Sequence, residues 1–225
     1  MKNKKYYIFE MNSSKLTIIS TILLLVMIIF TELIGKESLI FSNYFLILIL
    51  LIPYLIFHEI LHSISYVLHG AKFENITYGA HLEKGILCCL CKQNITKKNI
   101  LISLVYPLIF IGIITYIIGI IIDNSVLVSL SIFNISGCAG DIFMFIGLSK
   151  LKDFEYSEYD NPMAFGLYSS EDLSKKKMYA LDFKGTADKL EKQDMKKIRI
   201  SKASWITFAI FILVAILYFY IEYMM

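Results

Sequence analysis

Five apolar runs, each long enough to cross a lipid bilayer as a helix, constrain this chain most. A crossing needs about 20 apolar residues, because the hydrocarbon core is about 30 Å thick and a helix rises 1.5 Å per residue. The composition agrees, since 57% of the 225 residues are hydrophobic and only 18% are charged. We therefore predict an all-α, polytopic membrane helix bundle with about five transmembrane helices, at Leu16–Ile34, Tyr44–Leu68, Ile100–Ile122, Val126–Leu148 and Trp205–Tyr223.

These runs divide the chain into three parts. Residues 1–148 are expected to form a membrane-embedded core with spans at about 16–34, 44–68, 100–122 and 126–148, and its first span has no cleavage signal behind it. Residues 149–204 are expected to form one cytoplasmic loop segment: a short strand pair or a loop, then a basic helix resting on anionic lipid headgroups. Residues 205–225 are expected to form the C-terminal transmembrane helix.

The basic residues predict how the spans are oriented. Links rich and poor in Lys and Arg alternate along the chain, and the rich links are expected to be cytoplasmic. The N-terminal tail carries Lys2, Lys4, Lys5 and Lys15, whereas the 35–43 link carries only Lys36. Five lysines lie in the 69–99 link, none in 123–125, and twelve basic residues in 149–204. This pattern predicts a multi-pass cell-membrane protein with a cytoplasmic N-terminus and an external C-terminus. The sequence has no basic face with interleaved aromatic residues of the kind that binds nucleic acid, so we expect no nucleic-acid partner.

The motif "HEILH" places ionisable side chains inside the second apolar run. His58 and His62 are four residues apart, so on a helix both imidazoles lie on one face and can reach one zinc ion. Glu59 lies beside them as a candidate general base. An ionisable group in hydrocarbon needs a partner, and a metal ion supplies one for both histidines.

Two histidines leave a catalytic zinc site incomplete, because such a site usually takes three protein ligands and a water. Asp141 is the preferred third ligand: its depth in the fourth span falls between those of His58 and His62, and no Lys or Arg in a span core could pair with it. Other candidates remain open, namely His69, His81, Glu74, Glu83 and Cys138.

Other residues near the motif have two interpretations each. The amide of Asn134, two turns before Asp141, is expected to bond either to a neighbouring helix or to a substrate backbone. Pro53 and Pro107 are expected to kink the second and third spans. The cluster formed by Cys88, Cys89 and Cys91 is expected to hold free thiols, with a second zinc site or acylation as alternatives.

The chain resembles intramembrane zinc metalloproteases of the site-2 protease type. It is more similar to a group of small bacterial membrane proteins described as putative zincin peptidases. The matching stretches are "HEILH", "LVYPLIF" and "NISGCAGDI", so the resemblance covers roughly residues 44–150. It implies that His58, His62 and Asp141 bind zinc and that Glu59 is catalytic. The chain departs from site-2 proteases around Asp141, where it has Ala-Gly-Asp-Ile and they usually have Leu-Asp-Gly.

The sequence thus predicts an intramembrane zinc metallopeptidase with an HExxH motif, which hydrolyses membrane protein or peptide substrates in or near the bilayer. Zn²⁺ is the expected cofactor, and Asn134 is a candidate substrate-binding residue. The alternative is a non-enzymatic metal-binding membrane protein: a sensor, a scaffold or a pseudo-protease. A metal transporter is disfavoured, because only one ligand cluster is present and no ladder of polar groups crosses the bilayer.

Overall fold

The computed structural model describes residues 4–40, 43–81, 86–158 and 163–187. Its helical elements are α1 (Ser13–Leu33), η1 (Glu37–Leu39), α2 (Tyr44–Leu68), η2 (Phe73–Asn75), α3 (Lys97–Pro107), the π-helical η4 (Leu108–Ile114), α4 (Thr115–Ile121), α5 (Ser125–Gly137) and α6 (Ala139–Ser149). Its strands are β1 (Lys5–Met11), β2 (Ile76–His81), β3 (Ile86–Cys91), β4 (Ile95–Thr96), β5 (Glu155–Glu158), β6 (Ala164–Ser169) and β7 (Leu181–Ala187).

The prediction of an all-α bundle is wrong, because the described residues also form two β-sheets. One sheet has the strand order β4-β5-β6-β1-β7 with every pairing antiparallel, and the other is the β2–β3 hairpin. Strand β1, which lies between β6 and β7, pairs with residues far along the chain, for example Lys5 with Ser169. In the segment after α6, the structure confirms the short strand pair, one of the two expectations, because β5 pairs with β6. The same segment also supplies β7, which was not expected. Its expected basic helix, like the rest of 188–204, lies outside the described residues.

The described part of the chain contains fewer candidate membrane-crossing helices than the five that the sequence predicts. Three helical stretches are long and apolar enough to cross a bilayer, namely Ser13–Leu33, Tyr44–Leu68 and Lys97–Ile121. A fourth counts only if α5 and α6 form one span, since they are bent by 42° at the break between them. The expected span at 205–223 lies outside the described residues.

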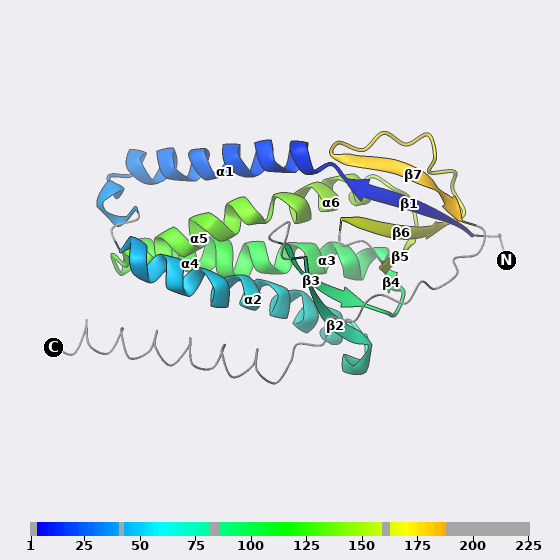
Figure 1. Ribbon diagram of the computed structural model, residues 1–225, viewed down its shortest axis with the longest axis horizontal. Helices are drawn as coiled ribbons and strands as arrows, with labels where there is room; N and C mark the ends of the chain where they lie inside the picture. The colour runs from blue at the N-terminus through cyan, green and yellow to red at the C-terminus, as the bar shows by residue number, and fades with distance from the viewer. Residues whose placement is uncertain (1–3, 41–42, 82–85, 159–162, 188–225) are drawn as a thin grey trace.

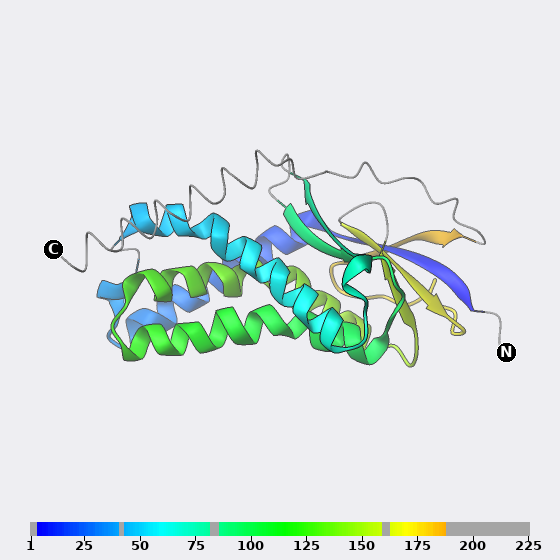
Figure 2. The same ribbon diagram turned by 90° about the horizontal axis from the view of Figure 1, so that it is seen from below.

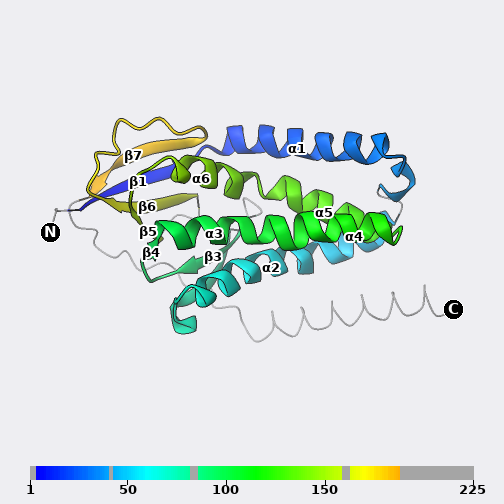
Figure 3. The ribbon, with the colours of Figure 1, turned by 180° about the vertical axis from the view of Figure 1, so that it is seen from behind.

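The helices lie alongside one another, and the five-stranded sheet occupies one end of them (Figure 1). The strand before α1, the link from α2 to α3 and the chain after α6 all lie at this end. The links from α1 to α2 and from α4 to α5 lie at the other end. Seen from below, α2 crosses the long α3–η4–α4 helix obliquely (Figure 2). From behind, that long helix is continuous from its start near β4 to the far end (Figure 3).

The largest hydrophobic core joins the sheet to the helix ends. Its fully buried members include Phe9 of β1, Ile100 of α3, Leu148 of α6 and Leu167 of β6. The strands bring aromatic and branched side chains to this core, and burial of such side chains stabilises a fold by about 1.5–3 kcal/mol each. The core therefore anchors the sheet-proximal ends of α3 and α6 against each other.

Partly buried hydroxyl groups join the helices in the middle of the helix layer. The Tyr54 hydroxyl of α2 lies 2.9 Å from Thr115 Oγ1 of α4, which lies 2.7 Å from Ser131 Oγ of α5. Hydrogen bonds between helices are typical of helix packing where no water competes. This network holds α2 in register with the helices that face it.

Two glycines in the five-stranded sheet provide a matched test of its packing. Ile8 of β1 pairs with Gly166 of β6 on one side and with Gly185 of β7 on the other. A Cβ at Gly166 would overlap the ring and hydroxyl of Tyr6, whereas a Cβ at Gly185 would meet nothing within 4 Å. We expect Gly166→Ala to lower the free energy of unfolding by about 1–3 kcal/mol and Gly185→Ala to leave it within about 0.5 kcal/mol. Thermal unfolding in detergent measures both, and equal stability of the two variants would contradict this packing.

Candidate metal centre

Helix α2 presents two histidines to the inside of the helix layer. His58 and His62 are only 8% and 7% exposed, although α2 is otherwise rich in outward-facing Leu, Ile and Phe. Because they are four residues apart, their rings lie one above the other on the same face. The two Nε2 atoms are 3.2 Å apart. The helix thus brings two nitrogen donors to one point.

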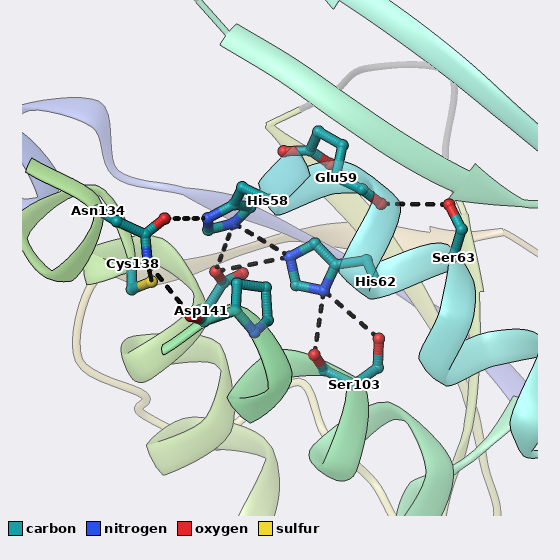
Figure 4. Close-up of polar contacts among 9 residues, drawn as sticks. His58, Glu59, His62, Ser63, Ser103, Asn134, Cys138 and Asp141 are labelled. Atoms are coloured by element: carbon teal, nitrogen blue, oxygen red, sulfur yellow. Dashed lines mark hydrogen bonds and ion pairs between the residues drawn. The ribbon is translucent and has the colours of Figure 1, made fainter. Parts of the chain in front are cut away.

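Helix α6 brings a carboxylate to the same point. The chain bends by 42° between α5 and α6, so α6 begins at Ala139 and Asp141 lies in its first turn. Its Oδ2 atom is 3.2 Å from His58 Nε2 and 3.6 Å from His62 Nε2. Among the described residues, these three form the one group of His, Cys, Asp and Glu side chains close enough to hold a metal ion together. Figure 4 shows the three side chains converging from the two helices.

The spacing of the three donor atoms fits a tetrahedral zinc ion. Bonds of about 2.0–2.1 Å from zinc to nitrogen or oxygen give donor–donor distances of about 3.3–3.4 Å in a tetrahedron. The observed distances of 3.2, 3.2 and 3.6 Å lie on either side of that value. Two imidazoles and one carboxylate are also a ligand set that catalytic zinc sites use.

In each histidine ring, the hydrogen bond made by Nδ1 determines whether Nε2, the nitrogen that faces the cluster, carries a proton or a lone pair. His58 Nδ1 lies 2.8 Å from Asn134 Oδ1, and His62 Nδ1 lies 3.0 Å from the carbonyl oxygen of Ser103. Both oxygens only accept, so both Nδ1 atoms donate, and in the neutral rings both Nε2 atoms carry lone pairs. Three acceptors then face one another, an arrangement that a cation stabilises. Metal-binding histidines are typically oriented in this way.

The amide of Asn134 is held from both sides within the protein. Its Nδ2 atom donates to the carbonyl oxygen of Pro107 at 3.2 Å, and its Oδ1 atom accepts from His58. Asn134 is 2% exposed. The sequence predicted that Asn134 bonds either to a neighbouring helix or to a substrate, and the described contacts of Asn134 are to neighbouring helices. The amide therefore positions His58, and a role in substrate binding stays a prediction.

Glu59 lies next to the cluster, on the side of α2 that the β2–β3 hairpin covers. Its carboxylate accepts a hydrogen bond from the backbone N–H of Cys89 in β3. One turn further on, Ser63 Oγ lies 2.5 Å from the Tyr78 hydroxyl of β2 and 3.1 Å from Cys89 Sγ. Burial raises the pKa of Tyr78, so this hydroxyl keeps its proton at neutral pH. The hairpin is thus fastened to α2 beside Glu59.

None of the alternative ligands joins the three donors among the described residues. His69 ends α2, and its Nδ1 atom donates to the carbonyl oxygen of Ser65 at 2.7 Å. Glu74 is exposed near Lys72. Cys138 is buried beside the cluster: its Sγ atom lies 3.6 Å from the Asn134 amide nitrogen, and its thiol contacts His58. The side chains of His81 and Glu83 lie outside the described residues.

The cysteines of β3 form no metal cluster among the described residues. Cys89 and Cys91 are buried, whereas Cys88 lies on the opposite face of the strand, and none of the three forms a disulfide. Strand alternation separates Cys88 from the other two. The structure thus offers nothing in support of a second zinc site here.

Sequence reasoning missed two groups that orient the histidines. The first is the backbone carbonyl of Ser103, and the second is the Pro107 carbonyl behind Asn134. A proline four residues after Ser103 signals that the Ser103 carbonyl lacks its usual helical donor. The sequence holds no signal that His62 is the residue bonded to it.

Residues 51–154 match the model of a protein family described as "Putative zincin peptidase". The matched stretch begins within α2, ends just before β5 and contains every residue of the cluster. The match covers less than half of the chain, and it supports a relation to this family. No curated protein and no solved structure gives a significant match to the chain.

Proposed function

We propose that this chain is a membrane-embedded zinc metallopeptidase that cleaves peptide bonds of membrane proteins in or near the bilayer. The observation that carries this proposal is the convergence of His58 Nε2, His62 Nε2 and Asp141 Oδ2 at zinc-like spacing. Both imidazoles are turned so that lone pairs face the centre. The family match over residues 51–154 supports the same chemistry. The likeness to site-2 proteases in motif order supports placing this chemistry within the membrane.

In this proposal His58, His62 and Asp141 hold the metal and Glu59 handles the proton. Zinc, when bound, lowers the pKa of a water molecule towards about 7 and polarises the scissile carbonyl. Glu59 takes a proton from the attacking water as the water oxygen bonds to the carbonyl carbon. Glu59 then gives that proton to the amide nitrogen as the C–N bond breaks, so the products are a carboxylic acid and an amine. The bond from the Cys89 N–H holds the carboxylate beside the site.

Several observations support the membrane placement. The outward faces of α1 and α2 are apolar, with exposed side chains such as Ile29, Phe30, Leu48 and Ile52. In the described part of the chain, the lysine-rich strand before α1, link from α2 to α3 and segment after α6 lie at the end that carries the sheets. Only Lys36 lies in the links at the other end. We therefore place the sheets and the N-terminus in the cytoplasm, and the C-terminus outside after a last span at 205–223.

A substrate helix hides its amides in internal hydrogen bonds, so it must unwind locally before attack. Cleavage is therefore expected where a substrate helix is broken or ends near the cytoplasmic face. The same donor set would also serve a sensor or scaffold that binds metal without catalysis. Glu59 favours the peptidase, because a purely structural metal site has no use for a carboxylate next to its ligands.

Metal removal tests the proposal. We expect 1,10-phenanthroline to stop the cleavage of membrane proteins by this chain and added zinc to restore it, because the attacking water needs the metal. Substrates are found first by comparing the N-termini of membrane proteins from cells with and without the chain. The cleavage of one such substrate is then followed in proteoliposomes. The non-chelating isomer 1,7-phenanthroline is the matched control, and cleavage that survives chelation would contradict a zinc mechanism.

A further inference from the structure

We propose that Pro107 is a positioning residue for the metal centre: it frees the backbone carbonyl that orients His62, and its own carbonyl holds the amide that orients His58. This inference rests on the proposed zinc site and adds a role for a residue of α3 that is not itself a metal ligand. It depends on three hydrogen bonds, all between buried groups.

The first step concerns the carbonyl oxygen of Ser103. In an α-helix this oxygen accepts the N–H of the residue four positions later. That residue is Pro107, which has no N–H. Ser103 is fully buried, so no water is available to satisfy its carbonyl. His62 Nδ1 lies 3.0 Å from this oxygen and supplies the missing donor.

The second step concerns the Pro107 carbonyl, one turn further along the same helix. Its oxygen accepts from Asn134 Nδ2 at 3.2 Å, which turns the amide oxygen towards His58 Nδ1 at 2.8 Å. The helix is π-helical from Leu108 to Ile114, directly after the proline. A π-helical segment changes the direction of the following turn and often accompanies a functional site. Gly112 in this segment lies close to Asn134, where a Cβ would come within 3.4 Å of the amide nitrogen.

Both imidazoles are therefore oriented from one helix that supplies no metal ligand. Replacing Pro107 by alanine would restore an N–H that competes with His62 for the Ser103 carbonyl. It would also remove the constraint that precedes the π-helical segment. Loss of an outer hydrogen-bond partner of a metal-binding histidine typically weakens metal binding by about 10- to 100-fold.

The test compares the zinc affinity of three variants of the full-length chain in detergent. Pro107→Ala introduces the N–H. Lactic acid at position 107, the α-hydroxy counterpart of alanine, has neither the ring nor an N–H, because an ester replaces the amide. Pro53→Ala is the matched control: it removes the other helical proline, whose freed carbonyl at Ile49 lies nine residues before His58. Zinc affinity is measured by competition with a chelator, and the visible spectrum of the cobalt-substituted protein reports ligand geometry.

We expect Pro107→Ala to raise the zinc Kd by about 10- to 100-fold and to alter the cobalt spectrum. We expect the lactic acid variant to restore both towards the wild-type values, and Pro53→Ala to change neither. Wild-type affinity in Pro107→Ala would overturn the inference, and a lactic acid variant as weak as Pro107→Ala would assign the effect to the ring. Wild-type protein that bound no zinc would overturn the proposed function as well. Zinc binding without peptide cleavage would count against the peptidase alone.

Discussion

Glu59→Gln is expected to reduce peptide cleavage by at least about 10²- to 10⁴-fold while zinc stays bound. A general base contributes that much to catalysis, and glutamine cannot accept the proton of the attacking water. The metal should remain, because Glu59 is not one of the three converging donors. Glutamine also keeps the shape of the side chain and an oxygen that can accept from the Cys89 N–H.

The measurement combines cleavage of an identified substrate in proteoliposomes with the zinc content of the same preparation. Glu74→Gln is the control, since Glu74 is an exposed carboxylate in the link after α2, paired only with Lys72 in the described contacts. It should cleave at the wild-type rate. If Glu59→Gln cleaved within about twofold of the wild type, Glu59 would lose its assigned role.

His58→Ala and Asp141→Ala are each expected to reduce bound zinc from about one ion per chain to a small fraction. Each variant leaves two donors, and a site with two protein ligands no longer has the set that zinc usually takes. The loss of affinity should exceed about 100-fold, because outer hydrogen-bond partners alone account for about 10- to 100-fold. The effect of Asp141→Ala is the more informative, since it asks whether α6 contributes to the same site as α2.

Elemental analysis of purified protein after equilibrium dialysis measures this loss. His69→Ala is the control, because His69 lies at the end of α2 with its Nδ1 bonded to the Ser65 carbonyl. It should retain one zinc ion. Full zinc binding by Asp141→Ala would remove the carboxylate from the centre, although His58 and His62 could still bind metal.

The two experiments together separate a peptidase from a metal-binding sensor or scaffold. A peptidase loses cleavage in all three variants but loses zinc only when a ligand is removed. A sensor or scaffold shows the same pattern of zinc loss with no cleavage by the wild type. Glu59→Gln is then silent in every measurement.

The site was more accessible to sequence reasoning than the fold. The spacing of His58 and His62 implies one helix face by the geometry of the helix alone. Asp141 joined them in the prediction through an argument about depth in the bilayer, and the structure brings its Oδ2 atom within 3.6 Å of both Nε2 atoms. Apart from the β5–β6 pair, the sheets were not predicted, because their strands are short and β1 pairs with partners more than 150 residues away. Such pairings leave no periodic signal within a local window.

The sequence by itself determined the long apolar helices, the uneven distribution of lysines and the presence of two imidazoles on one face. These properties depend on neighbours within a few turns, so they can be read locally. Only the tertiary structure decided that Asn134 turns towards His58 and that the Ser103 carbonyl meets His62. It also decided that the β2–β3 hairpin lies beside Glu59. The reason is physical: these contacts join separate elements, and their partners are set by how helices cross and strands pair rather than by any spacing along the chain.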